Sequence, residues 1–433
     1  MNLKRLSIAI FAFGLCFLGC GPEPLGGELT LKVVAPNDDF ASYELRQVQV
    51  SNVENIYQLQ HANFKFLGGG LLEGDDMQNL LTSEVTPQSF ATQTRSHFDQ
   101  TLEPHLAIRD EVVHAQDFHS LMALSAFAGF EKIWGWYVND IGDRSTATTE
   151  PGYVVFYGDI VPSNLLPVPM IQMDNAVYLA GVDVWMVFPV GNQEGVPYAM
   201  NQGVLAHEFH HRIFFQNVWT TSAFDRWKSI LSATESLSAS EQRNLNLLRA
   251  LDEGLADINA IGYTKNIGFM EPSFHSEHLD VVSAELLGAE SLRRNIESDF
   301  VDRATYDNLG DDSLEHALVD GCGVAQNFTT SGDILSGQAW SPYCLGSVVA
   351  RTIWEGVGRD HQLLREVMLP AINQTLFHLG EVLGTDQDFD FDVFFQLLLE
   401  SLPNTFDTAD LCSEIATRFS SLATADRIPL CAF

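Results

Sequence analysis

The pattern of hydrophobic and polar residues first indicates strands in the N-terminal part of the chain. In residues 28–34 and 44–50 hydrophobic and polar positions alternate, as expected for strands with one buried face. Glycine-rich segments interrupt the pattern as far as about residue 105. We therefore expect residues 28–108 to form a β-rich N-terminal region. The pattern is compatible with a cleavable pro-segment, an accessory domain or part of the sheet of the following domain.

From about residue 109 the chain changes to longer apolar segments with helical spacing. Residues 113–137 are apolar and rich in Ala and Leu, which predicts a long, largely buried helix. Strands are predicted at 153–158 and 176–190, and further helices at 200–216, from the capping-box sequence 238–241 onward, and at 345–356, 362–379 and 389–402. We therefore expect an α+β fold, with residues 109–433 as one domain that is helical from about residue 218.

The first twenty residues resemble the signal peptide of a bacterial lipoprotein. Two basic residues precede the apolar stretch Leu6 to Leu18, which is too short for a stable membrane-spanning helix. The stretch ends in Leu18-Gly19-Cys20, which is similar to a lipobox. The resemblance implies a signal peptide at 1–19 and lipid attachment at Cys20, with residues 20–27 as a tether. Gly rather than Asp follows the cysteine, which favours the outer membrane. The alternative is an ordinary secretory signal with Cys20 as a free thiol.

Composition and charge narrow the class of protein. Hydrophobic residues make up 46% of the chain and charged residues 18%, which excludes a disordered or fibrous chain and allows a sizeable core. Asp and Glu total 57 against 23 Lys and Arg, a formal net charge of −34. Such a chain repels phosphate backbones, so we expect no nucleic-acid partner.

The cysteines suggest disulfides. Four remain after the signal peptide and Cys20 are set aside: Cys322, Cys344, Cys412 and Cys431. An even number of cysteines outside the cytoplasm predicts two disulfides, for which three pairings exist. Proximity along the chain favours Cys322–Cys344 and Cys412–Cys431.

The most specific motif is the HExxH sequence from His207 to His211, on a predicted helix. Residues four apart lie on one helical face, so His207 and His211 can offer two imidazoles to one zinc ion. Glu208 then lies beside the metal, where a carboxylate can act as general base on a zinc-activated water. His210, three residues after His207, is the alternative second ligand, although the pair with Glu208 between is the better catalytic arrangement.

A second pair of residues provides a candidate third ligand. Glu253 and Asp257 are also four apart and share a helical face. Taken alone they are typical of a solvated acidic face. Together with HExxH, this ExxxD pair resembles the second metal motif of gluzincin metallopeptidases, in the EGxxD version of thermolysin- and fungalysin-like relatives. The resemblance implies a zincin-like catalytic domain in which Glu253 is the third zinc ligand and Asp257 orients a ligating histidine, His207.

Between these two residues stands Gly254, which costs a helix about 1 kcal/mol relative to Ala. A close approach of the two metal-bearing helices would explain that cost.

The resemblance covers about residues 110 to 400 in outline, with one departure. Glu253 lies 253 − 211 = 42 residues after His211, farther than in thermolysin-like enzymes, and residues 218–238 look like an inserted hairpin or loop over the site. Gluzincins often bind the transition-state oxyanion with a Tyr or His of the C-terminal subdomain. Candidates in that part of the chain are Tyr306, His316 and Tyr343, and no motif selects among them.

Two functions from different classes follow. The first is an envelope-anchored zinc metallopeptidase that hydrolyses a protein or peptide substrate, with Glu208 as the base. The alternative is a non-catalytic surface lipoprotein with a structural or vestigial zinc site. An adhesin-type module formed by residues 28–108 is a weaker third idea, because nothing in that region indicates a ligand.

Overall fold

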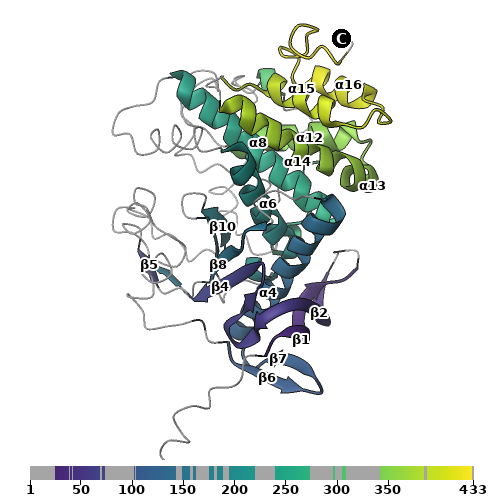
Figure 1. The fold of residues 1–433 in the computed structure, drawn as a ribbon. Coiled ribbons are helices and arrows are strands. Elements are labelled where there is room, and N and C mark those ends of the chain that lie inside the picture. Colours follow the sequence, from purple (N-terminus) through teal and green to yellow (C-terminus); the bar gives the residue numbers. More distant parts are fainter. Residues whose placement is uncertain are drawn as a thin grey trace, which may run out of the picture.

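The computed structural model has an α+β fold in which a mixed sheet lies on one side of a group of helices (Figure 1). The structure describes residues 25–38, 40, 42–68, 71–73, 102, 104–142, 149–156, 159–161, 175–179, 183–188, 195–219, 239–273, 296–297, 305–308, 342–384 and 388–431. The expected fold class is therefore confirmed. The signal peptide, Cys20 and the segment between residues 219 and 239 lie outside the described residues.

In the part of the chain that the structure describes, the larger sheet has nine strands in the order β10-β11-β8-β4-β3-β2-β1-β7-β6. These strands are β1 (Gly27–Pro36), β2 (Tyr43–Asn55), β3 (Gln60–His61), β4 (Phe64–Gly68), β6 (Leu106–Arg109), β7 (Val112–Ala115), β8 (Gly152–Phe156), β10 (Asn175–Leu179) and β11 (Val184–Phe188). A second sheet pairs β5 (Leu71–Glu73) with β9 (Asp159–Val161). Because β4 is hydrogen-bonded to β8 in parallel, the strands β1 to β4 of the N-terminal region lie in the same sheet as the strands that follow them.

The helices follow the predicted periodicity, with differences at their ends. They are α4 (Phe118–Trp136), which continues into a π-helical turn η2 (Tyr137–Ile141), α6 (Gln202–Val218), α8 (Ala239–Thr264), α12 (Pro342–Gly356), α13 (His361–Leu363), the π-helical η7 (Leu364–Met368), α14 (Leu369–Leu383), α15 (Phe391–Ser401) and α16 (Ala409–Arg418). Short 3-10 turns are η1 (Ile56–Gln58), η3 (Tyr198–Met200), η4 (Glu271–Ser273) and η5 (Tyr306–Asn308).

The start of the helix expected over 113–137 was wrong. Val112–Ala115 is a strand, and Asp117 caps α4 by accepting a hydrogen bond from the Ser120 N–H.

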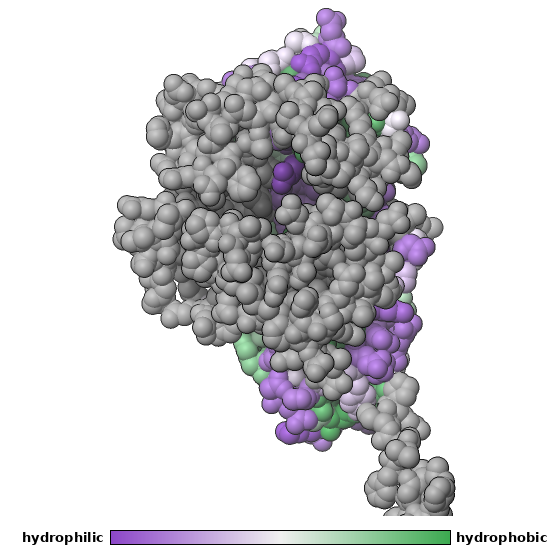
Figure 2. All heavy atoms as spheres, turned by 90° about the vertical axis from the view of Figure 1, so that its left-hand side faces the viewer, coloured by the Kyte–Doolittle hydropathy of each residue, from purple (hydrophilic) through white to green (hydrophobic). Residues whose placement is uncertain are grey.

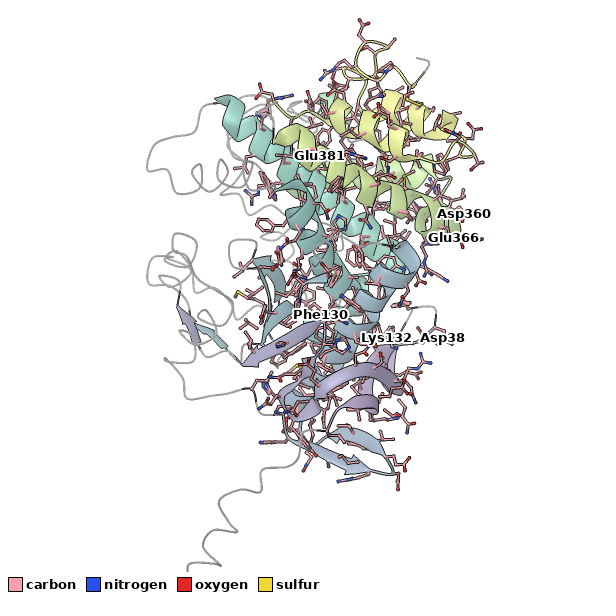
Figure 3. The ribbon with its side chains drawn as sticks, in the orientation of Figure 1. Asp38, Phe130, Lys132, Asp360, Glu366 and Glu381 are labelled. Carbon is pink, nitrogen blue, oxygen red and sulfur yellow. A yellow bond between two sulfur atoms is a disulfide. The ribbon has the colours of Figure 1, made fainter. Side chains whose placement is uncertain are left out.

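The core lies where α4 packs on the sheet. Phe130 of α4, labelled in Figure 3, contacts Phe64 and Phe66 of β4 and Trp185 of β11. Helix α6 contacts α4 on one side and α8 on the other. The same apolar core therefore fixes the position of the helix that carries the HExxH motif.

Gly254 of α8 makes a close approach, but to a different helix from the one expected. A Cβ built on Gly254 would meet the backbone carbonyl of Gly346 in α12, and a Cβ on Gly346 would lie 3.0 Å from the Ala250 oxygen. The expectation that Gly254 brings the two metal-bearing helices together was therefore wrong. The two glycines let α8 and α12 cross with their backbones in contact, and α12 supports the helix that carries Glu253 from behind.

We expect Gly254→Ala to destabilise the protein by about 1–3 kcal/mol, because the added methyl group has backbone rather than a flexible side chain to displace. The matched control is Gly135→Ala in α4, where the nearest atom to the new Cβ is the Asn139 Nδ2 at 3.9 Å. There the better helix propensity of Ala should leave stability unchanged or raise it. Chemical denaturation of both variants measures the difference in the free energy of unfolding. Equal stabilities of the two variants would contradict the close backbone contact between α8 and α12 at Gly254.

The C-terminal helices carry the disulfide that the structure describes. Cys412 of α16 is bonded to Cys431, so one of the two expected pairs is confirmed. The other pair, Cys322–Cys344, lies outside the residues whose side chains are described. Among the helices that the structure describes, none combines the length and the apolar character needed to span a bilayer.

Candidate metal centre

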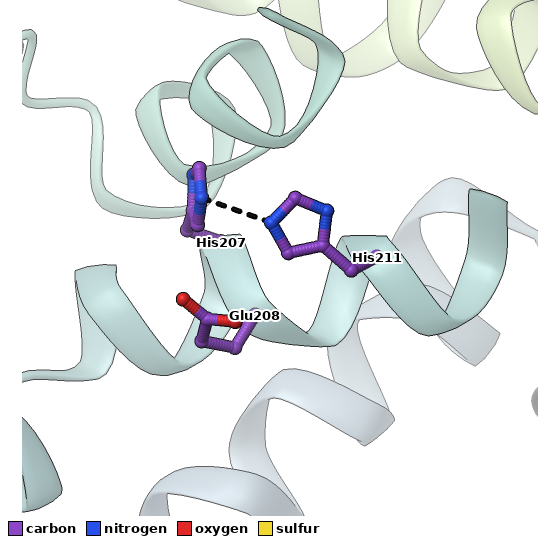
Figure 4. Close-up of side chains that lie close together, drawn as sticks. All are labelled: His207, Glu208 and His211. Atoms are coloured by element: carbon purple, nitrogen blue, oxygen red, sulfur yellow. Dashed lines mark hydrogen bonds between the residues drawn. The ribbon is translucent and has the colours of Figure 1, made fainter. Parts of the chain in front are cut away.

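Helix α6 places the two histidines of the HExxH motif next to each other, with their rings nearly perpendicular. Asn201 begins the helix by accepting hydrogen bonds from the backbone N–H groups of Gly203 and Val204. One turn apart, His207 and His211 point their Nε2 atoms toward each other at 3.1 Å (Figure 4). His207 is buried and His211 is nearly so, which shields the pair from bulk water.

A carboxylate from helix α8 reaches the same point. The Glu253 Oε2 atom lies 3.3 Å from the Nε2 of His207 and 3.9 Å from the Nε2 of His211. A tetrahedral zinc ion with bonds of about 2.0–2.1 Å separates its ligand atoms by about 3.3 Å. The three distances of 3.1, 3.3 and 3.9 Å therefore fit a single cation held between the two helices.

Glu208 also lies close to the two imidazoles. His207, Glu208 and His211 each offer a ligand atom within 4.8 Å of the others, a group that could hold a metal ion. However, Glu208 Oε2 accepts the backbone N–H of Tyr178 in β10 at 3.0 Å. This carboxylate is held by the sheet, while Glu253 lies at ligand spacing from both imidazoles, so Glu253 is the better placed of the two for a third ligand.

Two further carboxylates hold the far sides of the imidazole rings. His207 Nδ1 lies 3.0 Å from Asp257 Oδ1, and His211 Nδ1 lies 2.8 Å from Asp252 Oδ1. When each Nδ1 donates its proton to its carboxylate, a neutral ring directs its Nε2 lone pair at the shared point. All four side chains therefore act together to present two nitrogen lone pairs to a cation.

Sequence reasoning placed Asp257 beside His207 but missed Asp252. Asp252 directly precedes Glu253, so on a helix it projects about 100° away from that residue and outside the ExxxD pattern. No pattern in the sequence marks Asp252, because its partner His211 lies 41 residues earlier on a different helix. The contact becomes visible only when α6 and α8 are packed together.

His210, the alternative ligand, points away from this site. Its Nδ1 lies 3.0 Å from the Tyr137 hydroxyl, in the π-helical turn that ends α4. Burial lowers the pKa of His210 well below its usual value, and the nearby His211 and His207 lower it further. His210 is therefore a neutral residue of the core between α4 and α6.

The surrounding carboxylates change the charge of His211 in the metal-free protein. Burial by itself would lower the pKa of His211, but the charges of Asp252 and Glu253 and the hydrogen bond to Asp252 outweigh it and raise the pKa to about 10. At neutral pH both ring nitrogens of His211 then carry protons, one donated to Asp252 and the other to His207. A proton thus occupies the line between the two Nε2 atoms where a cation would bind.

We expect Zn²⁺ binding to the metal-free protein to release about one proton from His211 at neutral pH. Because the raised pKa keeps this proton in place below about pH 10, the competition weakens as pH rises. The apparent affinity should therefore increase about tenfold per pH unit between about pH 6.5 and pH 8.5. Isothermal titration calorimetry in buffers of different ionisation enthalpy measures the number of protons released.

The control for this prediction is Asp252→Asn, which keeps the size of the side chain and removes its charge. The pKa of His211 should fall, so that fewer protons are released at the upper end of the range and the pH dependence becomes shallower. Loss of the charged partner should also weaken binding by about 10–100-fold. The same proton release in both proteins would mean that the proton comes from another group.

Of the residues suggested for oxyanion binding, the structure describes the side chain of Tyr306 alone, and its hydrogen bonds are made elsewhere. The Tyr306 hydroxyl accepts a hydrogen bond from Arg243 and donates one to Asp390 at the start of α15. Burial and the Asp390 charge raise the pKa of Tyr306 to about 12, as expected for a phenol with a structural role. His316 and the side chain of Tyr343 lie outside the described residues.

Comparison with known proteins adds no family to this picture. No family model matches the chain, and no curated protein matches it. In the space-filling view of Figure 2, the described residues at the lower end of the molecule show hydrophilic and hydrophobic side chains next to one another. A proposal about function therefore rests on the sequence motifs and on the geometry of the side chains around His207 and His211.

Proposed function

We propose that this protein is a zinc-dependent metallopeptidase anchored to the bacterial cell envelope. The observation that carries the proposal is the convergence of His207, His211 and Glu253 on one point, with the further carboxylate of Glu208 beside it. A site that only binds metal has no need of that fourth group. A hydrolase needs it as a general base.

The donor set favours zinc over other common cations. Two imidazole nitrogens and one carboxylate oxygen are the ligands of many catalytic zinc sites, in which a fourth position is left for water or substrate. Calcium and magnesium prefer oxygen ligands throughout. When bound, zinc would lower the pKa of a water molecule and polarise the carbonyl group of the substrate.

Different residues of the chain then have different roles in the reaction. Glu208 takes a proton from the attacking water and passes it to the leaving amine of the cleaved bond. The Tyr178 N–H fixes the orientation of the Glu208 carboxylate. Asp257 and Asp252 bind the Nδ1 atoms of the two imidazole rings and so keep the rings in the orientation that binds the metal.

The sheet suggests how a substrate is bound. Among the described strands, β10 is at the edge of the nine-stranded sheet and pairs only with β11. It is also the strand that contacts Glu208. An extended peptide that adds to such an edge by main-chain hydrogen bonds would bring its peptide bonds past the base, which supports a peptide as the substrate class.

The cellular location is proposed from the N-terminal sequence. Lipid attached at Cys20 would anchor the protein, with a tether that ends at the start of β1 at Gly27. The glycine after the cysteine favours the outer membrane. The acidic chain, at a formal net charge of −34, suits a soluble domain held beside that surface.

The alternative is a lipoprotein with a structural or vestigial zinc site. A structural site is closed by a fourth protein ligand and needs no base. Measurement of zinc content together with hydrolysis of a mixed library of quenched fluorescent peptides distinguishes the two functions. We expect hydrolysis that stops on chelation and returns with Zn²⁺. One bound zinc per chain without hydrolysis of any peptide or unfolded protein would favour the structural alternative.

A further inference from the structure

The carboxylate of Glu208 is held by the hairpin of β10 and β11, and that hairpin is in turn held by helix α6. Tyr178 of β10 donates its backbone N–H to Glu208 Oε2 at 3.0 Å. Trp185 of β11 donates its indole N–H to the Glu208 backbone oxygen at 2.9 Å. The position of the hairpin therefore decides where the carboxylate of the base lies.

One turn after Glu208 on the same helical face, Arg212 makes a second and stronger connection. Its Nε and Nη2 atoms lie 2.8 and 3.1 Å from the two oxygens of Asp183, a paired geometry that fixes both distance and angle. The Arg212 side chain is only 2% exposed, although Asp183 is at 31%. The guanidinium carbon also lies 5.3 Å from the ring centroid of Trp185. This ion pair is thus largely shielded from solvent and has little freedom to rearrange.

Asp183 connects the two strands as well as the helix. It precedes β11 in the turn of the hairpin, with a left-handed backbone at φ 52°. Its Oδ1 accepts the Tyr178 hydroxyl at 2.8 Å in addition to Arg212. The same tyrosine therefore binds Asp183 through its side chain and Glu208 through its backbone.

We propose that the Asp183–Arg212 ion pair is a positioning device for the general base. It holds the hairpin against α6 so that the Tyr178 N–H keeps the Glu208 carboxylate in the orientation needed for proton transfer. Asp183 and Arg212 are positioning residues, since they act through Tyr178 and touch no reacting atom. The catalytic part of this inference rests on the proposed peptidase function, whereas the contact between hairpin and helix can be tested without it.

The test uses Asp183→Asn, Arg212→Met and the double variant in the full chain. We expect faster hydrogen exchange at the Tyr178 amide in each variant, because its hydrogen bond to Glu208 loosens. We expect kcat for peptide hydrolysis to fall by about 10²-fold at unchanged zinc content, since displacement of a catalytic group by about 1 Å has this effect. The double variant should lose no more activity than Arg212→Met alone, because that variant already lacks the contact with Asp183 and also the hydrogen bond from Arg212 to the Glu150 backbone oxygen.

A matched control separates positioning from stability. Arg427→Gln breaks another paired arginine, whose Nε lies 2.7 Å from Asp392 and whose Nη2 lies 3.0 Å from Asp390, in the C-terminal helical region. It should leave kcat and the Tyr178 exchange rate unchanged. If a variant at Arg212 fails to fold, Arg212→Lys keeps the charge without the paired geometry and should show an intermediate loss.

Each result decides the proposal. Unchanged exchange at Tyr178 in folded Asp183→Asn would overturn it, and so would faster exchange without any fall in kcat. An equal fall in kcat in the Arg427→Gln control would also overturn it. If the wild-type protein hydrolyses no peptide, the proposed function fails, while faster Tyr178 exchange in the variants would still show that the ion pair holds Tyr178 on Glu208.

Discussion

Glu208→Gln is expected to lower kcat for peptide hydrolysis by about 10²–10⁴-fold while the zinc content stays at the wild-type level. The amide oxygen of glutamine can still accept the Tyr178 N–H, so the local geometry is kept. What is lost is the ability to take up the proton of the attacking water. Steady-state kinetics and metal analysis on the same preparation measure the two quantities together.

The control for Glu208→Gln is Glu381→Gln in α14, an exposed carboxylate that pairs with His378 (Figure 3). This variant loses the same charge and should keep its activity. Full activity in Glu208→Gln with zinc bound would falsify the role of Glu208 as general base. Loss of zinc from Glu208→Gln would instead show that Glu208 is a ligand, which would reverse its assignment and that of Glu253.

Glu253→Gln should weaken zinc binding by more than about 10²-fold. A change to a group that only hydrogen-bonds to a metal ligand weakens binding by about 10–100-fold, and a change to the ligand itself should have a larger effect. The substitution keeps the side-chain shape but replaces the charged oxygen at 3.3 Å from the His207 Nε2 with a neutral amide. The two imidazoles then hold the cation without a negative charge opposite them. Competition with a fluorescent zinc chelator measures the affinity.

Asp257→Asn provides the graded comparison for Glu253→Gln. Asp257 contacts His207 on the Nδ1 side, so its change should weaken zinc binding by about 10–100-fold and less than the change at Glu253. An Asp257 variant that loses more affinity than the Glu253 variant would contradict the assignment of Glu253 as a ligand. Circular dichroism of both variants confirms that a fold remains.

Much of the site follows from spacing along the chain. The four-residue separations of His207 from His211 and of Glu253 from Asp257 place each pair on one face of a helix, whatever the rest of the fold. Helical periodicity also identified α6 and α8, because their apolar positions are local in sequence. These features need no knowledge of long-range contacts.

Other features were decided only when the helices packed. Gly254 is a local signal for close approach, but the sequence does not state which helix approaches, and it was α12 rather than α6. His210 and His211 are neighbours in sequence, yet one faces Tyr137 in the core and the other faces the candidate metal site. Burial of each helical face against a particular partner makes these choices, and that partner lies far along the chain.

The sequence by itself determined the α+β class, the main helices and the five residues of the two motifs, because these depend on periodicity within short segments. Only the tertiary structure placed the described strands of residues 28–108 in the sheet, brought Asp252 to His211 and set the β10–β11 hairpin on Glu208. Strand pairing and helix crossing depend on apolar surface and hydrogen bonds supplied by distant segments, and no local pattern encodes which segments will meet.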